Sequence, residues 1–281
     1  MNIKDILAKT VDYFEKYEIP KPRLDAEVLL ADLLGMERIN LYVNFDRPVS
    51  AEEVDAYREL ILKRRQGTPV AYLVGKKEFM GLEFEINSEV LIPRPETEHV
   101  VEMILNRIDS WEQEEVKIAD IGTGSGAIII SSAYLADKKV TGVGVDISQV
   151  SLDVAQRNAA KWEVEENLVF RKGNLLEPLE EEFDIIVSNP PYIPSAELDN
   201  LQIEVQQEPQ LALDGGTDGL DYYREIITTA KNYLRQEGLL IFEVGNEQSQ
   251  SVVDLLTAEG YQEIEISQDY SEVERVVSAL N

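Results

Sequence analysis

The sequence predicts an α/β protein in which a small helical bundle precedes a larger domain built on a mainly parallel, doubly wound sheet. From residue 116 onward, β-rich segments alternate with helical segments, a pattern typical of parallel sheets covered by helices. Residues 1 to about 68 show helical periodicity alone. In addition, the segment 116–121 leads directly into a glycine-rich loop and then a helix, which favours a ligand site at the sheet edge.

Composition restricts the possible partners. The 281 residues suffice for a large and a small domain. Lys and Arg number 26 against 54 Asp and Glu, so the net charge of −28 disfavours phosphate backbones and favours basic partners. An acidic or halophilic proteome would give the same balance, so charge alone decides little. We expect no direct nucleic-acid binding.

The residue inventory also excludes several chemistries. Without cysteine there are no disulfides, thiolates or cysteine-based zinc sites, and one histidine excludes multi-histidine metal sites. We therefore expect no metal. No apolar run approaches the ~20 residues of a membrane span, and residues 1–10 lack the apolar core of a signal peptide. The expectation is a cytoplasmic protein with no membrane partner.

Three helices are expected in the first domain, residues 1–68. Apolar residues recur at helical spacing from Ile3 to Tyr17, and a second helix runs from about Leu24 to Leu34. The third opens at a capping box, Ser50 with Glu53, and extends to Arg65. Such a module either packs structurally or holds a macromolecular partner, and its position before an α/β domain favours the partner.

Residues 69–92 are predicted to form a β-hairpin linker. The segments 70–74 and 78–86 are β-rich, and Gly75 and Gly81 provide turns. A stiff polar segment, 91–98, then leads into a helix from about 97 to 108, and by composition it is only a helix entry. His99 lies just inside that helix, where a solvated or capping role is expected.

The glycine loop follows the first strand of the larger domain, residues 93–281. Gly122-Thr-Gly-Ser-Gly126 permits a tight turn and close backbone approach, and the helix 127–136 offers unpaired N–H groups. The next strand, 140–145, ends at Asp146, which is placed to accept hydrogen bonds from ribose hydroxyls. The pair indicates an adenosine-containing cofactor without saying which one. Asp120 is either a second acceptor or a strand-end cap.

The remaining segments complete a seven-stranded sheet whose last two strands, 262–268 and 274–279, are antiparallel. A helix capped by Ser148 runs to about Trp162, and the strand 168–172 ends near Asn174 and Leu175, which are placed to border an adenine. Further helices are expected at 222–234 and 248–258, with a strand at 239–244. The irregular stretch 193–219 is too long for an idle loop and is expected to form a substrate-side surface.

Ser188-Asn-Pro-Pro-Tyr192 follows the apolar strand 183–187, at the carboxyl edge of the sheet. Two prolines fix the backbone, so Asn189 lies on a stiff, extended segment. The Asn189 side-chain oxygen and the Pro190 carbonyl can jointly accept hydrogen bonds from one planar NH2 group, and Tyr192 offers a ring face. In isolation the motif is equally consistent with a proline-rich turn.

Together, Asp120-Ile-Gly-Thr-Gly-Ser-Gly126, Asp146 and Asn189-Pro-Pro-Tyr192 resemble a class I S-adenosylmethionine-dependent methyltransferase that acts on nitrogen. The sequence more closely resembles the HemK/PrmC family, which methylates the glutamine of the Gly-Gly-Gln motif in class I release factors. That resemblance rests on the segments 69–75, 78–84, 90–98 and 208–213, with Gly216 and the segment 218–220. It covers the hairpin and the whole catalytic domain, and it implies that the segment 94–97 is a cofactor-side wall rather than only a helix entry.

The resemblance implies a Rossmann-like seven-stranded sheet with the last strand antiparallel, S-adenosylmethionine as cofactor and S-adenosylhomocysteine as product. The implied catalytic residues are Asn189, Pro190 and Tyr192. The implied cofactor-binding residues are Asp120, Gly122, Thr123, Gly124, Ser125, Gly126, Asp146, Ile147, Asn174, Leu175 and Asn189. The implied substrate-binding residues are Asn189, Pro190, Pro191, Tyr192, Arg94 and Glu96. Asn174 departs from the family pattern, where Asp is common, which puts only the strength of the adenine contact in doubt.

Three alternatives use the same residues. A DNA or RNA adenine methyltransferase would hold an exocyclic amine with Asn-Pro-Pro-Tyr, but a net charge of −28 argues against the basic groove it needs. A nicotinamide oxidoreductase fits the glycine loop and leaves Asn-Pro-Pro-Tyr unexplained. A non-catalytic binding module would require a vestigial pocket, whereas each pocket segment is intact. The partner that the resemblance implies is a class I release factor, and residues 1–68 are its expected docking module.

Overall fold

The computed structural model describes all 281 residues, and the chain divides into two compact units. One unit comprises Met1–Lys76 together with Gln202–Gln207, and the other comprises Lys77–Leu201 together with Glu208–Asn281. We call them the helical unit and, after the role that the family resemblance implies, the catalytic unit. None of the helices combines the length and apolar character that crossing a bilayer requires.

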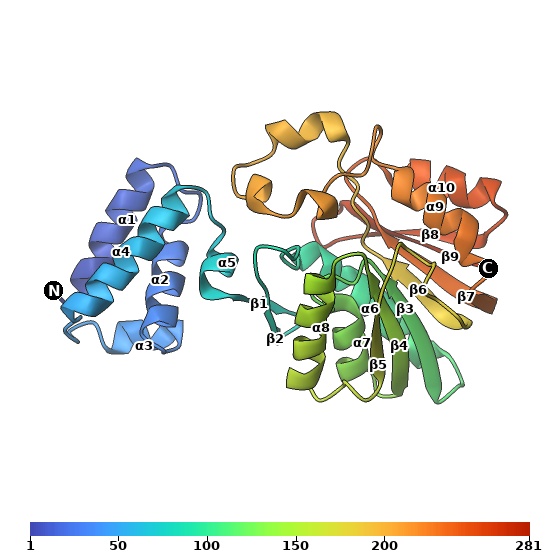
Figure 1. Ribbon diagram of the computed structural model, residues 1–281, viewed down its shortest axis with the longest axis horizontal. Coiled ribbons are helices and arrows are strands. Elements are labelled where there is room, and N and C mark those ends of the chain that lie inside the picture. Colours follow the sequence, from blue (N-terminus) through green and yellow to red (C-terminus); the bar gives the residue numbers. More distant parts are fainter. The chain divides into compact units, whose positions relative to one another are not determined.

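The helical unit is a bundle of five helices, labelled in Figure 1. They are α1 (Ile3–Lys16), α2 (Pro22–Leu33), α3 (Arg38–Val43), α4 (Ala51–Arg65) and α5 (Val70–Val74). Their apolar faces enclose a core that includes the fully buried side chains Phe14, Leu29, Leu30, Leu41 and Tyr57. The predicted capping box is present, because Ser50 accepts from the Glu53 N–H and Glu53 accepts from the Ser50 N–H.

The prediction of a β-rich segment at 70–74 is wrong, because these residues form α5. Pro69 precedes the helix and Gly75 ends it in the left-handed conformation, with φ of +72°. Val70, Leu73 and Val74, at helical spacing, pack against the bundle core. The hairpin is confined to β1 (Lys76–Phe79) and β2 (Leu82–Glu85).

A six-residue segment from much later in the sequence, Gln202–Gln207, completes the helical unit. Its Glu204 pairs with Arg64 of α4, whose guanidinium also donates to Asp25 (Nε to Oδ2, 2.7 Å). Arg64 is only 2% exposed. Ile203 packs so closely on Gly67 that a β-carbon there would come within 2.7 Å of its side chain. The segment is thus held by apolar contact and by an ion pair to a buried arginine.

The catalytic unit contains a seven-stranded sheet of order β5-β4-β3-β6-β7-β9-β8. The strands are β3 (Glu115–Ile121), β4 (Lys139–Asp146), β5 (Leu168–Lys172), β6 (Phe183–Ser188), β7 (Leu234–Glu243), β8 (Gln262–Gln268) and β9 (Glu274–Leu280). The first five are parallel, and β9 runs antiparallel to both β7 and β8. The predicted sheet is confirmed, including its antiparallel last strand.

Helices cover both faces of this sheet and bury two separate cores (Figure 1). α6 (Glu98–Ser110), α7 (Ala127–Leu135) and α8 (Gln149–Lys161) pack on one face, and α9 (Asp221–Ala230) and α10 (Ser249–Ala258) pack on the other. Alternate strand residues supply the two cores: Ile118 and Ile185 lie on the α6 side, Ala119 and Ile186 on the α9 side.

The parallel strands end at one level, which creates the edge where the predicted site lies. Register pairs Ile121 with Val145 across β3 and β4, Ile121 with Ser188 across β3 and β6, and Ser188 with Phe242 across β6 and β7. β3 lies between β4 and β6, so the connections from it leave in opposite directions. A doubly wound sheet binds ligands at such a switch point.

Irregular chain surrounds this edge. A 3₁₀ turn, η1 (Pro95–Thr97), leads into α6. The stretch after the Asn-Pro-Pro-Tyr motif contains three more such turns, η2 (Ser195–Asn200), η3 (Val205–Gln207) and η4 (Gln210–Ala212), as expected of an irregular segment.

Candidate functional site

A cavity of about 190 Å³ opens in the catalytic unit at the carboxyl ends of β3, β4, β5 and β6. Predicted site residues that line it are Gly122, Gly124, Asp146, Ile147, Asn174, Leu175, Asn189, Pro190 and Pro191. Residues from flanking segments complete the wall: Glu89, Leu91, Pro209, Leu211, Ala212 and Tyr222 among them. One cavity therefore brings together the glycine loop, the acid after β4 and the Asn-Pro-Pro motif.

The glycine loop turns sharply at the end of β3. The N–H groups of Gly122 and Thr123 both donate to the Val145 carbonyl at 2.9 Å, which joins the loop to β4. Gly122, Gly124 and Gly126 all have positive φ, of +74°, +55° and +80°. A side chain at 126 would also collide with Ile130, so glycine is required there by both conformation and space.

Asp146 is fixed at the cavity wall by backbone donors. Its Oδ2 accepts from the Gly124 N–H at 2.9 Å, and its Oδ1 accepts from the Ser148 N–H at 2.8 Å. Burial raises the pKa of Asp146, and these N–H groups oppose that rise by favouring the charged form. Each oxygen keeps a further lone pair, so the carboxylate can still accept from two ligand hydroxyls.

Asp120 lies behind the loop and does not line the cavity. It is 1% exposed, and its Oδ2 accepts from the Thr123 hydroxyl at 2.7 Å. Burial raises the pKa of Asp120 to about 7. Its Oδ1 has no hydrogen-bond partner. Asp120 thus caps the strand end and shapes the loop through Thr123.

At the end of β5, Asn174 and Leu175 form another part of the wall. The Asn174 amide donates to Glu225 of α9 (Nδ2 to Oε1, 3.3 Å). This bond leaves the Asn174 side-chain oxygen as an acceptor. Leu175 has a φ of +45°, which directs the chain sharply away from the strand.

Asn189 follows β6, and the Ser188 hydroxyl ties this strand end to β3 by donating to the Ile121 carbonyl at 2.7 Å. The Asn189 side chain donates from Nδ2 to Thr97 Oγ1 at 3.3 Å. Asn189 is half-buried, whereas Pro190 is buried. The amide oxygen of Asn189 is thus directed away from Thr97 while the residue lines the cavity.

Glycines close the backbone around Tyr192. Built β-carbons at Gly215, Gly219 and Gly245 would each come within 3 Å of Tyr192 atoms, and the Tyr192 carbonyl accepts from Gln248 at 2.9 Å. Burial raises the pKa of Tyr192 to about 12, so the phenol stays protonated. This residue is half-buried and packs against the α9-side core, outside the cavity lining.

Arg94 and Glu96 also lie outside the cavity lining. Arg94 pairs with the buried Glu208, whose second oxygen accepts from the Ile92 N–H at 3.2 Å. The ion pair joins the segment before α6 to the loop after Asn-Pro-Pro-Tyr. Thr123, Ser125 and Gly126, like Asp120, lie in or behind the loop rather than on the cavity surface. His99 contacts Glu102 (Nδ1 to Oε2, 2.9 Å) and the ring of Tyr270.

Sequence reasoning did not place two residues beside Asn189: Thr97, which it included only in the implied cofactor-side wall 94–97, and Glu243, which it did not single out. Thr97 is 4% exposed and contacts Asn189 directly, and Glu243, at the end of β7, is 3% exposed. Burial raises the pKa of Glu243 to about 7. A signal for Glu243 is present in the sequence, because it is an acid that directly follows four apolar residues of a central strand.

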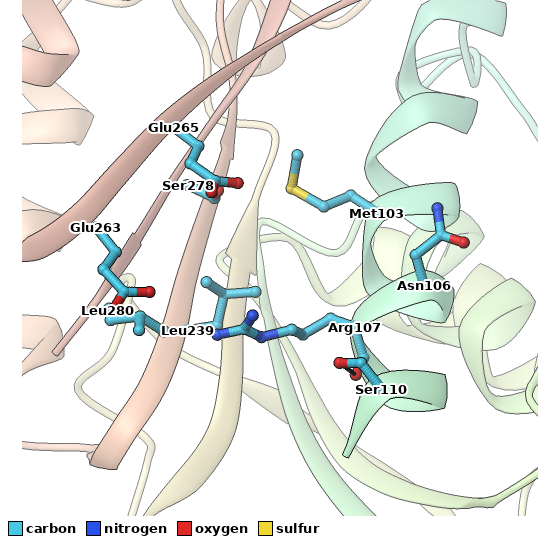
Figure 2. Close-up of a pocket in the computed structure, with 9 residues that line it drawn as sticks. All are labelled: Met103, Asn106, Arg107, Ser110, Leu239, Glu263, Glu265, Ser278 and Leu280. Atoms are coloured by element: carbon cyan, nitrogen blue, oxygen red, sulfur yellow. Dashed lines mark hydrogen bonds between the residues drawn. The ribbon is translucent and has the colours of Figure 1, made fainter.

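A second cavity, of about 230 Å³, lies elsewhere, between α6 and the strands β7, β8 and β9. Figure 2 shows Arg107 extending from α6 toward Leu239 and Leu280, with Glu263 and Glu265 on the strand side. None of the predicted site residues lines it. Although larger, it lacks the strand-end position and the glycine loop of the first cavity.

Solved structures share this fold. A methyltransferase from Pyrococcus furiosus matches over 72% of this chain and 89% of its own, with a TM-score of 0.53 and 16% identity. The hMettl16 catalytic domain in complex with MAT2A 3'UTR hairpin 6 matches with a TM-score of 0.59, 15% identity and coverage of 84% of this chain and 85% of that one. The fold is that of class I methyltransferases.

Two family models match the sequence. The PrmC N-terminal domain matches residues 5–75, and the ribosomal protein L11 methyltransferase (PrmA) model matches residues 97–202. The release factor glutamine methyltransferase of Geobacter sulfurreducens is 41% identical over 98% of this chain and 95% of its own length. That of Moorella thermoacetica is also 41% identical, over 96% and 95%. The chain belongs to the release factor glutamine methyltransferase family.

Proposed function

We propose that this protein transfers a methyl group from S-adenosylmethionine to the side-chain nitrogen of the glutamine in the Gly-Gly-Gln motif of class I release factors. The observation that carries the proposal is a full-length relationship to release factor glutamine methyltransferases, in a chain whose Asn189 and Pro190 line the cavity. A protein that modifies release factors acts in the cytoplasm, where translation ends.

The cavity residues fit S-adenosylmethionine. Asp146 would accept from the ribose hydroxyls, since both its oxygens keep lone pairs beyond the Gly124 and Ser148 contacts. Ile147 and Leu175 offer apolar contact to an adenine, and Asn174 offers an acceptor. The glycine loop, free of side chains at 122 and 124, lets the rest of the cofactor approach the backbone. When bound, the cofactor supplies an electrophilic methyl group on a sulfonium.

The chain must orient the glutamine amide, because conjugation with the carbonyl delocalises the nitrogen lone pair. Asn189 Oδ1 and the Pro190 carbonyl would each accept a hydrogen bond from one N–H of the amide. These two bonds would orient the nitrogen lone pair toward the methyl group. The same two acceptors stabilise the positive charge that develops on nitrogen as the bond to carbon forms. Tyr192 lies outside the cavity lining, so its ring would support the motif from the core side rather than cover the amide plane. No strong base is required, because proton loss can follow transfer.

The helical unit is the proposed docking site for the release factor. Its residues 5–75 match the PrmC N-terminal domain model, and methylation of a free small molecule would have no need of such a module. The docking role is assigned to the helices of residues 1–68. Residues 69–92, with α5 and the hairpin, connect them to the catalytic domain, residues 93–281.

One assay tests the function. The enzyme is incubated with S-adenosylmethionine labelled in the methyl group and offered a class I release factor, the same factor with glutamine of Gly-Gly-Gln replaced by glutamate, duplex DNA, or no acceptor. Label should enter only the unmodified release factor. Equal incorporation into the glutamate variant would refute glutamine as the acceptor, and incorporation into DNA would establish an adenine methyltransferase instead.

A further inference from the structure

The far end of the Asn-Pro-Pro-Tyr motif is held by a glutamine side chain from another segment. Gln248 lies between β7 and α10, and its Nε2 donates to the Tyr192 carbonyl at 2.9 Å and to the Gly219 carbonyl at 3.5 Å. Its Oε1 accepts from the Gly245 N–H at 3.1 Å. One half-buried side chain thus joins three segments, which are the motif, the loop before α9 and the turn after β7.

The packing around these bonds fixes the side chain in place. A β-carbon on Gly219 would lie 2.3 Å from the Tyr192 carbonyl oxygen and 2.6 Å from Gln248 Nε2. A β-carbon on Gly245 would lie 2.5 Å from Gln248 Oε1. Both glycines are buried. They therefore leave the space that the Gln248 side chain fills, and close packing restricts it to this position.

The bonds of Gln248 do not serve the helix that it precedes. Gln248 is the N-cap residue of α10, yet its side chain makes no hydrogen bond to that helix. The residues that cap helices well are Ser, Thr, Asp and Asn. Ser148, at the same position of α8, does accept from the Ser151 N–H. The Gln248 side chain instead turns back toward Tyr192 and Gly245, so its bonds stabilise the motif rather than the helix end.

The motif is a short, stiff segment that is held at both ends. At its start, Ser188 pairs within the sheet and its hydroxyl donates to the Ile121 carbonyl at 2.7 Å. At its end, Gln248 holds the Tyr192 carbonyl. The two prolines between these points have fixed φ, so rotation about their N–Cα bonds cannot absorb a displacement of Tyr192. Such a displacement would therefore reach the residues of the motif that line the cavity.

We propose that Gln248 is a positioning residue that keeps Asn189 Oδ1 and the Pro190 carbonyl in place for the substrate amide through its bond to the Tyr192 carbonyl. This inference rests on the proposed function, in which these two oxygens accept from the glutamine NH2. Gln248 does not line the cavity, so it acts through the motif. A displacement of about 1 Å in such a site can cost up to about a hundredfold in rate.

Two substitutions and a matched control test the role. Gln248→Met removes both kinds of bond at nearly constant size. Gln248→Glu keeps an acceptor for the Gly245 N–H but loses the donor to Tyr192. Gln250→Met removes an exposed amide of α10 that donates to Asp254 at 2.9 Å. With both substrates saturating, we expect kcat to fall about tenfold in Gln248→Met, the effect of losing one buried hydrogen bond, and at least as far in Gln248→Glu. Gln250→Met should stay close to wild type.

Cofactor affinity separates positioning from a general loss of structure. Because Gln248 is not part of the cavity lining, calorimetry should give all three variants the S-adenosylmethionine affinity of the wild type. If only the bond to Gly245 mattered, Gln248→Glu would keep wild-type kcat. Wild-type kcat in either folded Gln248 variant, or equal losses of kcat and cofactor affinity, would overturn the proposal.

A readout without catalysis keeps the two proposals apart. The Ile193 N–H, next to the motif, donates to the Leu213 carbonyl at 3.0 Å, and the Gly245 N–H donates to Gln248. Amide exchange of both, measured by NMR on the enzyme alone, should be faster in Gln248→Met and unchanged in Gln250→Met. If exchange behaves so but release factor is not methylated, the proposed function is wrong and the hold on the motif stands. If release factor is methylated and both amides exchange as in wild type, the positioning role is wrong.

Discussion

Asn189 combines a fixed backbone with a single free acceptor. Its side-chain nitrogen is bound to Thr97, and the strand before it is tied to β3 through Ser188. We predict that Asn189→Ala lowers kcat about a hundredfold, because one oriented transition-state contact is worth ~3 kcal/mol. Single-turnover methylation of release factor, with S-adenosylmethionine affinity measured in parallel by calorimetry, checks this. Undiminished turnover would show that the amide is oriented by other groups.

Asp146→Ala should affect the cofactor rather than the acceptor. A ribose contact does not distinguish S-adenosylmethionine from S-adenosylhomocysteine, so the affinities for both should fall together. The expected loss is ~1.5 to 3 kcal/mol for a charge-assisted hydrogen bond. Calorimetry with each ligand provides the measurement, and Asp153→Ala, an exposed acid on α8, is the control. Unchanged affinity for both ligands would place the ribose elsewhere.

Among single residues, the sequence predicted those whose local pattern marks them, such as polar residues directly after an apolar strand. The Asn-Pro-Pro motif and Asp146 each stand directly after an apolar strand, and both line the cavity. Thr97 and Glu243 were missed because both are distant from Asn189 in the chain: Thr97 meets it through a side-chain hydrogen bond, and Glu243 lies beside it only after β6 and β7 pair. Thr97 lies inside the segment 90–98 that carries the family resemblance, yet nothing near it in sequence indicates Asn189 as its neighbour.

The turn between β3 and α7 shows how an element depends on one backbone position. Gly126 has a φ of +80°, and a β-carbon there would lie 2.5 Å from Ile130 Cδ1. Gly81, in the hairpin of the same unit, has a φ of +73° and open space around it. Gly81→Ala should cost about 1 kcal/mol of conformational strain, and Gly126→Ala about 2 to 4 kcal/mol, because overpacking adds to strain. Urea unfolding of the two variants gives the comparison, and equal midpoints would mean that Ile130 relaxes freely.

Elements were predictable where one signal dominated. The helix after Ser148 and the one after Ser50 begin at capping side chains, as expected. The strand prediction for residues 70–74 was wrong. The valines of this segment favour strands, but Pro69 before it, Gly75 after it and packing on the bundle select a helix. The outcome depended on tertiary contact that residue preferences do not contain.

The acidic charge of the whole molecule is unevenly distributed between its units. Residues 1–76 hold 12 basic and 13 acidic side chains, whereas residues 77–281 hold 14 and 41. The catalytic unit therefore carries nearly all of the net charge of −28. If the substrate is a basic, RNA-facing domain, attraction to the catalytic unit speeds the encounter, and the nearly neutral helical unit contributes specific contacts.

This distribution predicts a salt effect on encounter rather than on chemistry. We expect kcat/KM for release factor to fall as ionic strength rises, since a Debye length of about 10 Å at 0.1 M screens such attraction. The value of kcat at saturating substrate should change little. Initial rates across a salt series, with cofactor saturating, supply the check. A kcat/KM independent of salt would show that electrostatic steering does not contribute to the encounter.

The sheet was predictable as a whole because alternating strands and helices admit few topologies, and β9 followed the expected antiparallel pattern. The membership of Gln202–Gln207 in the helical unit was not. That segment falls in an irregular stretch of the catalytic chain, and the reason for its placement is Arg64, about 140 positions earlier, together with the space left by Gly67.

This shared segment has a consequence for cutting the protein. A protease nick between Lys76 and Lys77 leaves Gln202–Gln207 on the larger fragment, while its binding partners Arg64 and Gly67 remain on the smaller one. The two fragments then keep a common surface, so nicking alone should release neither, and separately expressed halves should reassociate. Deleting the helices would leave Glu204 without Arg64 and Ile203 without its contact with Gly67. Cleavage at the boundary between residues 76 and 77 is therefore not expected to separate the two fragments.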